Sequence, residues 1–399
     1  MRKLATVRKI KEIIPIVGAD LIELVIVDGW QCVVKKGDFK VGDKGIYFEI
    51  DSFLPIIPIF EFLRKGCFKR MGEKEGFRLR TIKLRKQRSQ GIIMPLSQFA
   101  DIIDGIETMS VNEDLTEILN VDKFEKPIAP QLAGSVVGSF PSFIRKTDQE
   151  RIQNEFDPFT AEFNDNNEEI IEELTAIDPI KFKERIQELT ENRTPNLIKD
   201  LLFEETIKLD GSSMTCFIID PIKFQTKKIG NMLQDTLPED YFGVCSRNLE
   251  LKENPDNTLW KVALRDFKEA MKDYHKTTKR NIAIQGEIMG PGIQGNREQL
   301  KDHEMFVYEI WDIDNQRYLT RDERHEITSK YNLKEVPFIR ISKVFDIFKT
   351  VNDILDYAEG PSLNHPTREG IVFKSTTLVN GYTVSFKAIS NKFLLKGGD

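Results

Sequence analysis

The sequence Lys-Leu-Asp-Gly at residues 208–211 places a lysine two positions before an acidic turn residue. Five other charged residues interrupt apolar segments further along the chain: Arg247, Glu287, Glu369, Lys374 and Lys387. Cations bind phosphate oxygens and carboxylates bind Mg²⁺, so these side chains would together suit a polyphosphate–metal substrate. A lysine among other cations would have a lowered pKa and act as a nucleophile.

Each of these residues also has a simpler interpretation. Lys208 could be a surface lysine that flanks an Asp-Gly hairpin turn, Glu287 could cap the Gly-rich turn after it, and Phe306 could belong to the core. Only the order and spacing of the whole set favour the chemical interpretation.

The elements that must position this set are short apolar strands separated by helices. The expected strands cover residues 206–219, 282–290, 305–313, 369–375 and 382–389, and a helix is expected over 259–276. This pattern predicts an α+β architecture with antiparallel sheets, in which polar side chains are spaced along several strands.

The first 100 residues are rich in short strands with glycine turns. Residues 21–34 are two β-branched runs joined across Asp28-Gly29, which predicts a hairpin. About five such strands predict a small β-barrel, for which the OB fold is the commonest architecture.

A run of eleven Lys or Arg against two Glu covers residues 64–88. Such a run is often only a solvated face. Because the cations alternate along an expected strand at 77–88, we favour a phosphate-binding track, as OB barrels bind single strands on such a face. The candidate nucleic-acid contacts are Arg78, Arg80, Lys83 and Arg85.

The overall composition indicates a soluble intracellular protein, cytoplasmic or nuclear and compatible with a viral source. The four cysteines form no CxxC pair, the four histidines have no metal-ligand spacing, and no apolar stretch of about 18 residues occurs. Prolines mark a connector over 101–150, and an acidic insertion with no assigned chemistry lies near 155–200. The expected domains are therefore 1–125, an OB-fold domain, and 126–399, a catalytic domain.

Six segments resemble, in the expected order, motifs I, Ia, III, IIIa, IV and V of the covalent nucleotidyltransferases, which include DNA ligases, RNA ligases and capping enzymes. They are "KLDG" (208–211), "SRN" (246–248), "GEIMGPGIQGN" (286–296), "MFVYEIWDI" (305–313), "EGIVFK" (369–374) and "SFKAISNKFLLK" (385–396). "VCSRNLEL" and "SFKAISNKFLL" resemble ATP-dependent RNA ligases in particular. Residues 3–55 resemble the N-terminal OB module of the Naegleria-type RNA ligases, and "FPSFIRKTDQERIQN" (140–154) resembles that group's lead-in to the nucleotide pocket.

The resemblance implies an ATP-grasp-like ligase domain in which Lys208 attacks the α-phosphate of ATP. The resulting lysyl–AMP would pass AMP to an RNA 5′-phosphate, and a 3′-OH would then seal the strand. Asp210, Glu287 and Glu369 would lie around Mg²⁺ or Mn²⁺, with a second ion on the β- and γ-phosphates.

The remaining nucleotide contacts also follow from the resemblance. Arg247 and Glu287 would contact the ribose, Phe306 would stack on adenine, and Lys387 with Lys374 would neutralise the α-phosphate. The other implied contacts are Arg151, Thr206 and Ile207.

Two positions depart from the family pattern. Ile207 stands where many RNA ligases have Glu, so that a backbone carbonyl or another side chain would read the adenine. Ile389 stands where many relatives have the second lysine of a Lys-x-Lys pair, so that Lys387 would rely on Lys374 or Lys392.

The expected partner is RNA with 3′-OH and 5′-phosphate ends in a nicked duplex, bound by a monomer without a membrane. Three alternatives stay open: a nick-sealing ligase with relaxed sugar preference, a capping guanylyltransferase, and a nucleic-acid-binding protein whose catalytic fold is inactive.

Overall fold

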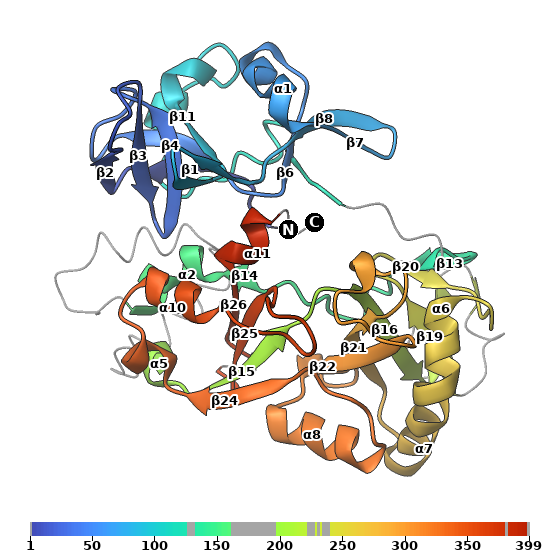
Figure 1. Cartoon of the computed structure of the whole chain (residues 1–399). Helices are drawn as coiled ribbons and strands as arrows, with labels where there is room; N and C mark the ends of the chain where they lie inside the picture. Colours follow the sequence, from blue (N-terminus) through green and yellow to red (C-terminus); the bar gives the residue numbers. More distant parts are fainter. Residues whose placement is uncertain are drawn as a thin grey trace.

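The computed structural model describes residues 2–125, 132–160, 197–221, 228–229, 232–233, 240–379 and 382–396. Figure 1 shows the N-terminal strands packed together on one side of the molecule and elements β13 to β26 on the other. Most of the acidic insertion, residues 161–196, lies outside the described residues. None of the described helices is long and apolar enough to cross a membrane.

The N-terminal part is built from short strands around two apolar cores. Its elements are β1 (Ala5–Lys9), β2 (Glu12–Pro15), β3 (Ile22–Val27), β4 (Trp30–Lys35), β5 (Lys44–Phe48), β6 (Ser52–Leu54), α1 (Arg64–Cys67), β7 (Phe68–Met71), β8 (Lys74–Arg78), β9 (Thr81–Leu84), β10 (Gln87–Gln90), β11 (Ile92–Pro95) and β12 (Asp122–Lys123). The strands pair as β1-β5-β11, β2-β3-β4, β12-β6-β8-β7 and β9-β10. Within residues 2–125 these hydrogen-bonded sheets do not close into one barrel.

The predicted hairpin at 21–34 is confirmed. Strands β3 and β4 pair with Val27 opposite Trp30, and Asp28 in the turn between them has φ 49°. Trp30 is fully buried, as the alternation of this strand requires.

The single cationic strand expected at 77–88 is wrong. The chain breaks after β8 and makes a separate two-stranded hairpin from β9 and β10, with Arg85 and Lys86 in the turn. Both turn residues have positive φ, 46° and 70°, as a two-residue type I′ turn requires. Because Asn-Gly usually fills this turn, the Arg-Lys sequence concealed it.

The C-terminal part contains two antiparallel-rich sheets. The seven-stranded sheet has the order β13-β20-β19-β16-β21-β22-β23 and the five-stranded sheet has the order β14-β26-β25-β15-β24. Their strands are β13 (Val136–Ser139), β14 (Glu150–Arg151), β15 (Phe203–Lys208), β16 (Ser212–Ile219), β19 (Tyr241–Cys245), β20 (Leu249–Leu251), β21 (Ile282–Met289), β22 (Glu304–Asp312), β23 (Arg317–Tyr318), β24 (Phe338–Ser342), β25 (Gly370–Ser375) and β26 (Ser385–Ile389). A further small pair is formed by β17 (Lys228–Ile229) and β18 (Met232–Leu233).

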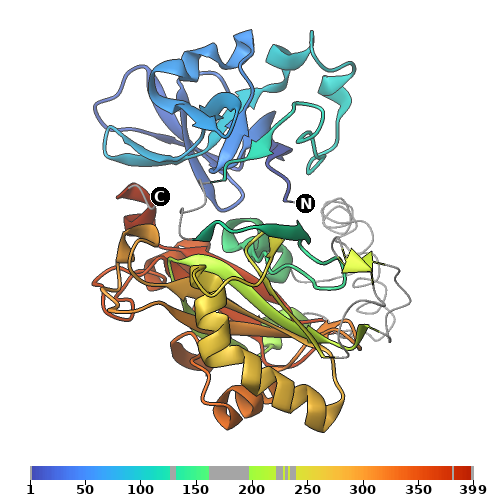
Figure 2. The same cartoon turned by 90° about the vertical axis from the view of Figure 1, so that its right-hand side faces the viewer.

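Helices cover these sheets and connect their strands. They are α2 (Ile152–Thr160), α5 (Leu197–Asp200), α6 (Thr258–Val262), α7 (Lys268–Thr278), α8 (Arg321–Lys330), α9 (Val344–Ile347), α10 (Val351–Tyr357) and α11 (Asn391–Leu395). The predicted helix at 259–276 is confirmed as α6 and α7 joined by a π-helical turn, and it packs on the core under the seven-stranded sheet (gold in Figure 2).

The link between β15 and β16 decides the position of Lys208. Strand β15 ends at Lys208 and pairs with β24 and β25, whereas β16 pairs with β19 and β21 in the other sheet. The interpretation of Lys208 as a residue beside a hairpin turn is therefore wrong, because Leu209 to Gly211 carry the chain from one sheet to the other.

The β3–β4 turn and helix α11 both contribute to the contact between the N-terminal part and the C-terminal sheets. The β3–β4 turn meets the first turn of α2, where the Gly29 N–H donates to the Gln153 carbonyl at 3.1 Å and Trp30 Nε1 donates to Asn154 Oδ1 at 2.7 Å. Helix α11 lies between the two parts (Figure 1), and its Leu394 packs on the core formed by β3, β4 and β5.

Candidate active site

Lys208 forms an ion pair at the junction of the two sheets. Strand β15 places it opposite Gly370, the first residue of β25, so that the preceding residue Glu369 lies beside it. Lys208 Nζ is 2.8 Å from Glu369 Oε1, and the lysine side chain is 27% exposed. The amine is thus held in place but still open to a substrate.

Gly211 and Glu287 form the second contact at this junction. The Gly211 N–H donates to Glu287 Oε1 at 3.0 Å. A Cβ at Gly211 would lie 2.5 Å from the Ile288 carbonyl oxygen, so only glycine lets the chain pass this close to β21. The glycine of Lys-Leu-Asp-Gly therefore serves to bring Glu287 close to Lys208.

Asp210 is held by an arginine that the sequence analysis did not identify. Arg297 Nη1 is 3.1 Å from Asp210 Oδ2, and Arg297 Nη2 donates to the Thr367 carbonyl at 2.9 Å. The Arg297 guanidinium also lies 4.6 Å from the ring centroid of Phe393 in α11. Asp210 is consequently connected to the helix that contacts the N-terminal part.

The pKa of Lys208 lies above its ordinary value, which contradicts the expected lowering. Burial lowers this pKa, but the charges of Glu369, Glu287 and Asp210 raise it more. The sequence suggested cationic neighbours, whereas the structure surrounds the amine with carboxylates. Burial, offset in part by Lys208, raises the pKa of Glu287 to about 7.

The carboxylates of Asp210, Glu287 and Glu369 are suitable ligands for a divalent cation, but they are not arranged as a preformed metal site. Among the described residues, no three His, Cys, Asp or Glu side chains are arranged to hold a metal ion. Lys208 and Arg297 pair with two of the predicted ligands, Glu369 and Asp210. Mg²⁺ usually binds to one or two carboxylates plus substrate phosphates, so this donor set fits an ion that arrives with a polyphosphate.

Lys374 lies inside the protein in a charge pair. Its Nζ is 2.7 Å from Glu309 Oε1, both side chains are 5% exposed, and the ammonium also donates to the Tyr308 carbonyl. Burial lowers the pKa of Lys374 although Glu309 raises it. The structure therefore places this predicted phosphate ligand against Glu309.

Arg151 and Lys387 lie together at the boundary between the two parts of the chain. Strands β14 and β26 pair in parallel with Arg151 next to Lys387. Arg151 Nη2 is 3.2 Å from Asp51 Oδ2, and Lys387 Nζ is 3.2 Å from Asp148 Oδ1. Two buried donors of Arg151, Nε and Nη1, have no hydrogen-bond partner among the described residues.

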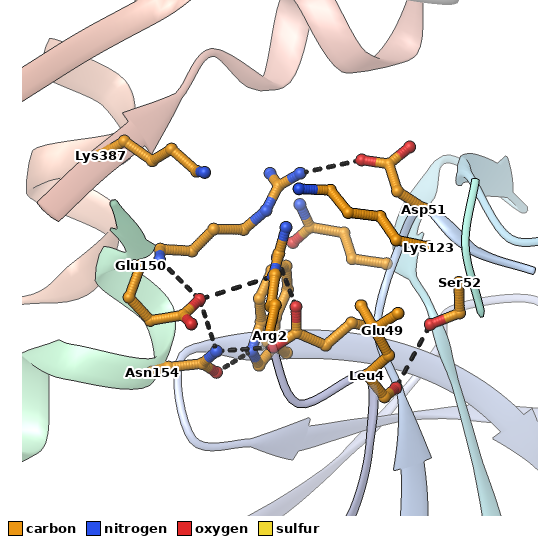
Figure 3. A network of polar contacts seen from close by, with 12 residues as sticks. Arg2, Leu4, Glu49, Asp51, Ser52, Lys123, Glu150, Asn154 and Lys387 are labelled. Atoms are coloured by element: carbon orange, nitrogen blue, oxygen red, sulfur yellow. Dashed lines mark hydrogen bonds and ion pairs between the residues drawn. The ribbon is translucent and has the colours of Figure 1, made fainter. Parts of the chain in front are cut away.

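Two further cations, Arg2 and Lys123 of the N-terminal part, approach Lys387, as Figure 3 shows. Arg2 pairs with Glu49 and lies 3.6 Å from Glu150, and Lys123 Nζ is 3.2 Å from Asp148 Oδ2. We call Arg2, Lys123, Arg151 and Lys387 the boundary cluster.

The boundary cluster gives Lys387 an unusual pKa. Burial lowers it, Asp148 raises it, and Arg2, Arg151 and Lys123 lower it again, to about 7. A buried group of cations with unsatisfied N–H donors attracts an anion, because each unpaired buried donor is costly.

The other predicted nucleotide contacts lie at different depths. Thr206 and Phe306 are buried, and Phe306 packs with Leu209, Met289 and Val336. Ile207 donates its N–H to the Pro337 carbonyl at 2.9 Å and is partly buried beside the same group. Arg247 is exposed after β19, and its charge lowers the pKa of Lys123, so it lies near the boundary cluster.

The four predicted RNA contacts divide into two sets. Arg78 is 7% exposed, lies 3.1 Å from Asp51 and stacks on Phe124, because β8 turns it toward the boundary between the two parts. Arg80, Lys83 and Arg85 are exposed on or next to the β9–β10 hairpin.

The sequence analysis missed several polar residues of the site. Arg297 follows the "GPGIQGN" segment directly, and Tyr308 is two positions after Phe306, so both could have been found from those motifs. The Tyr308 hydroxyl lies 3.4 Å from Ser213 Oγ and from Thr147 Oγ1. Asp148 is in the lead-in segment, but nothing in the local sequence indicates Arg2 or Asp51.

Comparison with known proteins gives two family matches and a full-length structural match. Residues 4–96 match an OB-fold domain model and residues 202–389 match an RNA ligase model. No curated protein sequence matches the chain. Naegleria gruberi RNA ligase with PPi is 39% identical, with a TM-score of 0.76 and full coverage of both chains.

Two substituted forms of the same Naegleria enzyme are similar. One, with ATP and Mn, is 39% identical with a TM-score of 0.76 and full coverage of both chains. Another, with AMP and Mn, is 38% identical with a TM-score of 0.75 over 98% of each chain. Identity at this level over the whole length shows the family. The chain belongs to the RNA ligases of the nucleotidyltransferase superfamily, with an N-terminal OB-fold domain and an antiparallel-sheet ligase domain, and its substrate is RNA.

Proposed function

We propose that this RNA ligase uses ATP to join 3′-OH and 5′-phosphate ends through a lysyl–AMP on Lys208 and an RNA-adenylate. The observation that carries the proposal is the position of Lys208, whose Nζ lies 2.8 Å from Glu369 where β15 passes into the second sheet. Structures of the Naegleria relative with ATP, AMP and PPi support the nucleotide chemistry.

In the first step the Lys208 amine attacks the α-phosphorus of ATP. An N–P bond forms, the bond from that phosphorus to the bridging oxygen breaks, and pyrophosphate leaves. The amine must first lose the proton that Glu369, Glu287 and Asp210 hold on it, because only the neutral form has a free electron pair.

The three carboxylates would hold Mg²⁺ or Mn²⁺, with a second ion on the β- and γ-phosphates. Such an ion supplies positive charge beside Nζ and the α-phosphate, which lowers the pKa of the amine. The carboxylate of Glu287 is free of a direct cation partner among the described residues and accepts only the Gly211 N–H at 3.0 Å. We therefore assign it as a principal ligand.

The triphosphate would lie toward the boundary cluster. Two buried donors of Arg151 have no partner there among the described residues, and Lys387 lies next to Arg151 on β26. Lys387 would neutralise the α-phosphate as negative charge builds. Arg247 near Lys123, Phe306, Thr206 and Ile207 would complete the nucleotide pocket.

The two later steps transfer AMP and seal the strand. An RNA 5′-phosphate oxygen attacks the adenylate phosphorus, which breaks the N–P bond and returns a free Lys208 amine. A 3′-OH then attacks the activated 5′-phosphorus, a phosphodiester forms, and AMP leaves. Arg80, Lys83 and Arg85 on the OB-fold side would contact this RNA.

The organisation of the protein follows from the same proposal. We place the domain boundary near residue 125, between the OB-fold match ending at 96 and the ligase match starting at 202. A monomer acting on a nicked duplex is the proposed working state. The four cysteines are free thiols, which fits a reducing, intracellular compartment.

Labelled ATP with Mg²⁺ tests the proposal in one experiment. The wild-type protein is expected to form a labelled covalent adduct, Lys208→Ala is expected to form none, and Lys261→Ala, an exposed lysine in α6, serves as the control. An adduct that persists in Lys208→Ala would refute the assignment. Labelled GTP in a parallel reaction tests the capping-enzyme alternative.

The adenylated protein is then given nicked duplexes. Sealing is expected when ribonucleotides flank the nick and is expected to be much slower on all-DNA nicks. Equal rates on both would favour the alternative of a ligase with relaxed sugar preference.

A further inference from the structure

The β9–β10 hairpin carries cations at positions where they weaken the hairpin itself. Lys83 lies directly opposite Arg88 in the β9–β10 register, and like charges at facing positions destabilise a strand pair. Arg85 and Lys86 form the turn at φ 46° and 70°, a conformation that Asn and Gly adopt far more easily. Two unfavourable choices at one hairpin indicate a function other than stability.

Among the described residues, no carboxylate neutralises the cations of this hairpin. Residues 76–100 contain six Lys or Arg and no Asp or Glu. Lys83, Arg85, Lys86 and Arg88 form no ion pair within the part of the chain that the structure describes, and the first three are exposed. Ile82 and Leu84 between them are 46% and 39% exposed, so apolar surface adjoins the charges.

The other half of the cationic run differs. Arg64 pairs with Glu61, Arg70 with Glu75, Lys74 with Asp122 and Arg78 with Asp51. Figure 1 shows β7 and β8 at the end of the OB-fold domain away from β4, the strand that β10 packs against. The two halves of residues 64–88 are therefore separate surfaces.

A line of contacts leads from the hairpin to Lys208. Gln90, at the base of the hairpin, donates its Nε2 to Asn391 Oδ1 of α11 at 3.3 Å. In the same helix Phe393 lies against Arg297, which binds Asp210, two residues after Lys208. The face of the hairpin that bears Gln90 also bears Arg88 and Lys83, because alternate residues share a face.

We propose that the β9–β10 hairpin binds the phosphodiester backbone of the RNA beside the ends being joined. Lys83 and Arg88 on one face of the hairpin, and Arg85 and Lys86 at its tip, contact the phosphates. The β7–β8 half of residues 64–88 does not bind the RNA. This inference rests on the proposed sealing of RNA. The positive charge of the hairpin favours RNA over a protein partner. Bound phosphates would offset the repulsion between the cations of the hairpin.

Replacing the two turn residues removes positive charge from the hairpin without weakening its fold. Arg85→Asn with Lys86→Gly installs the preferred type I′ turn, so the hairpin keeps its shape and the thermal midpoint is expected to stay the same or rise. The matched control is Lys65→Gln with Lys69→Gln, which removes the same charge from α1 and β7, where both side chains are exposed and form no ion pair with a described residue.

The measurement is the affinity of each full-length protein for a nicked RNA duplex, by fluorescence anisotropy over a series of salt concentrations. Losing two phosphate contacts is expected to reduce the slope of log affinity against log salt by about 1.4–1.8 in the turn variant, with roughly tenfold slower sealing of pre-adenylated RNA. The control variant is expected to keep the wild-type slope.

The proposal is overturned if the turn variant keeps the wild-type slope, or if the control loses as much as the turn variant does. A turn variant with normal RNA binding that fails to retain a protein partner would indicate a protein-docking surface instead. Failure of the wild-type protein to form an AMP adduct would count against the proposed function alone, because the binding measurement needs no chemistry.

Discussion

Lys208 and Lys387 are two partly or wholly buried lysines whose pKa values are shifted in opposite directions. Burial lowers both pKa values. At Lys208 the nearest charges are Glu369, Glu287 and Asp210, and the pKa ends above its ordinary value. At Lys387 the carboxylate of Asp148 is outweighed by burial and three cations, and the pKa falls to about 7.

Burial is the largest single influence on both pKa values, and the neighbouring charges account for the opposite directions of the two shifts. A lysine surrounded by carboxylates is held charged until a cation or substrate removes their influence, which suits a nucleophile that must stay inactive without ATP. A lysine among cations is ready to accept an anion, and a phosphate beside it restores its proton. We therefore propose that the surroundings of Lys208 suit a nucleophile and that those of Lys387 suit a phosphate pocket.

The largest expected effect is on the rate of adenylation, in the Lys387→Ala variant. Removing the cation proposed to neutralise the α-phosphate should lower the rate of protein–AMP formation roughly 10²-fold, because a single donor at a developing charge has this effect. Single-turnover adenylation with labelled ATP measures it. Lys374→Ala is the informative companion, since its partner Glu309 would be left unpaired and unstable folding, measured by thermal unfolding, is expected instead.

A smaller effect is expected from Asp148→Asn. Asp148 raises the pKa of Lys387, so its removal should bring that pKa below about 7 and leave less of the protonated lysine at neutral pH. The descending limb of kcat/KM for ATP, which falls as pH rises through this pKa, should move to lower pH. Asp256→Asn, an exposed residue before α6, should leave the profile unchanged. If the descending limb of the pH profile does not move in Asp148→Asn, Lys387 is not the group that titrates there.

The smallest effect is expected on stability, from Glu287→Gln. In the folded protein Glu287 keeps its proton up to a pKa of about 7, whereas the unfolded chain releases it near the ordinary value of 4.5. Wild-type stability therefore falls as pH rises between these values, and the neutral glutamine avoids this loss. The variant should be more stable by about 1–3 kcal/mol at pH 8 and no more stable at pH 4, in denaturant unfolding without metal. Reduced stability at pH 8 would contradict the assigned charge state.

The sequence predicted the elements of the ligase domain well because its signals are local. Strands at 282–290, 305–313 and 369–375 appear as β21, β22 and β25, since each combines apolar alternation with turn residues at its ends. The motif order also indicated that Lys208, Glu287 and Glu369 would meet, and the register of β15 with β25 brings Glu369 to the lysine.

The sequence could not predict the surroundings of these residues. Whether Lys208 would face cations or carboxylates depends on which strands pair across the junction, and the simplest inference gave the wrong direction for its pKa. Asp51 pairs with Arg151 and Arg2 lies beside Glu150, each across 100 positions of sequence or more, so only the docking of the two domains brings them together. Arg78 looked like its exposed neighbours in sequence, yet Asp51 and Phe124 bury it.

Mapping the adduct by mass spectrometry tests the central claim most directly. Wild-type protein is incubated with ATP and Mg²⁺, digested under conditions that preserve the N–P bond, and searched for peptides that carry AMP. The account predicts one modified peptide with AMP on Lys208, which is also protected from tryptic cleavage. AMP on Lys374 or Lys387, or no modified peptide in a preparation that seals RNA, would contradict it.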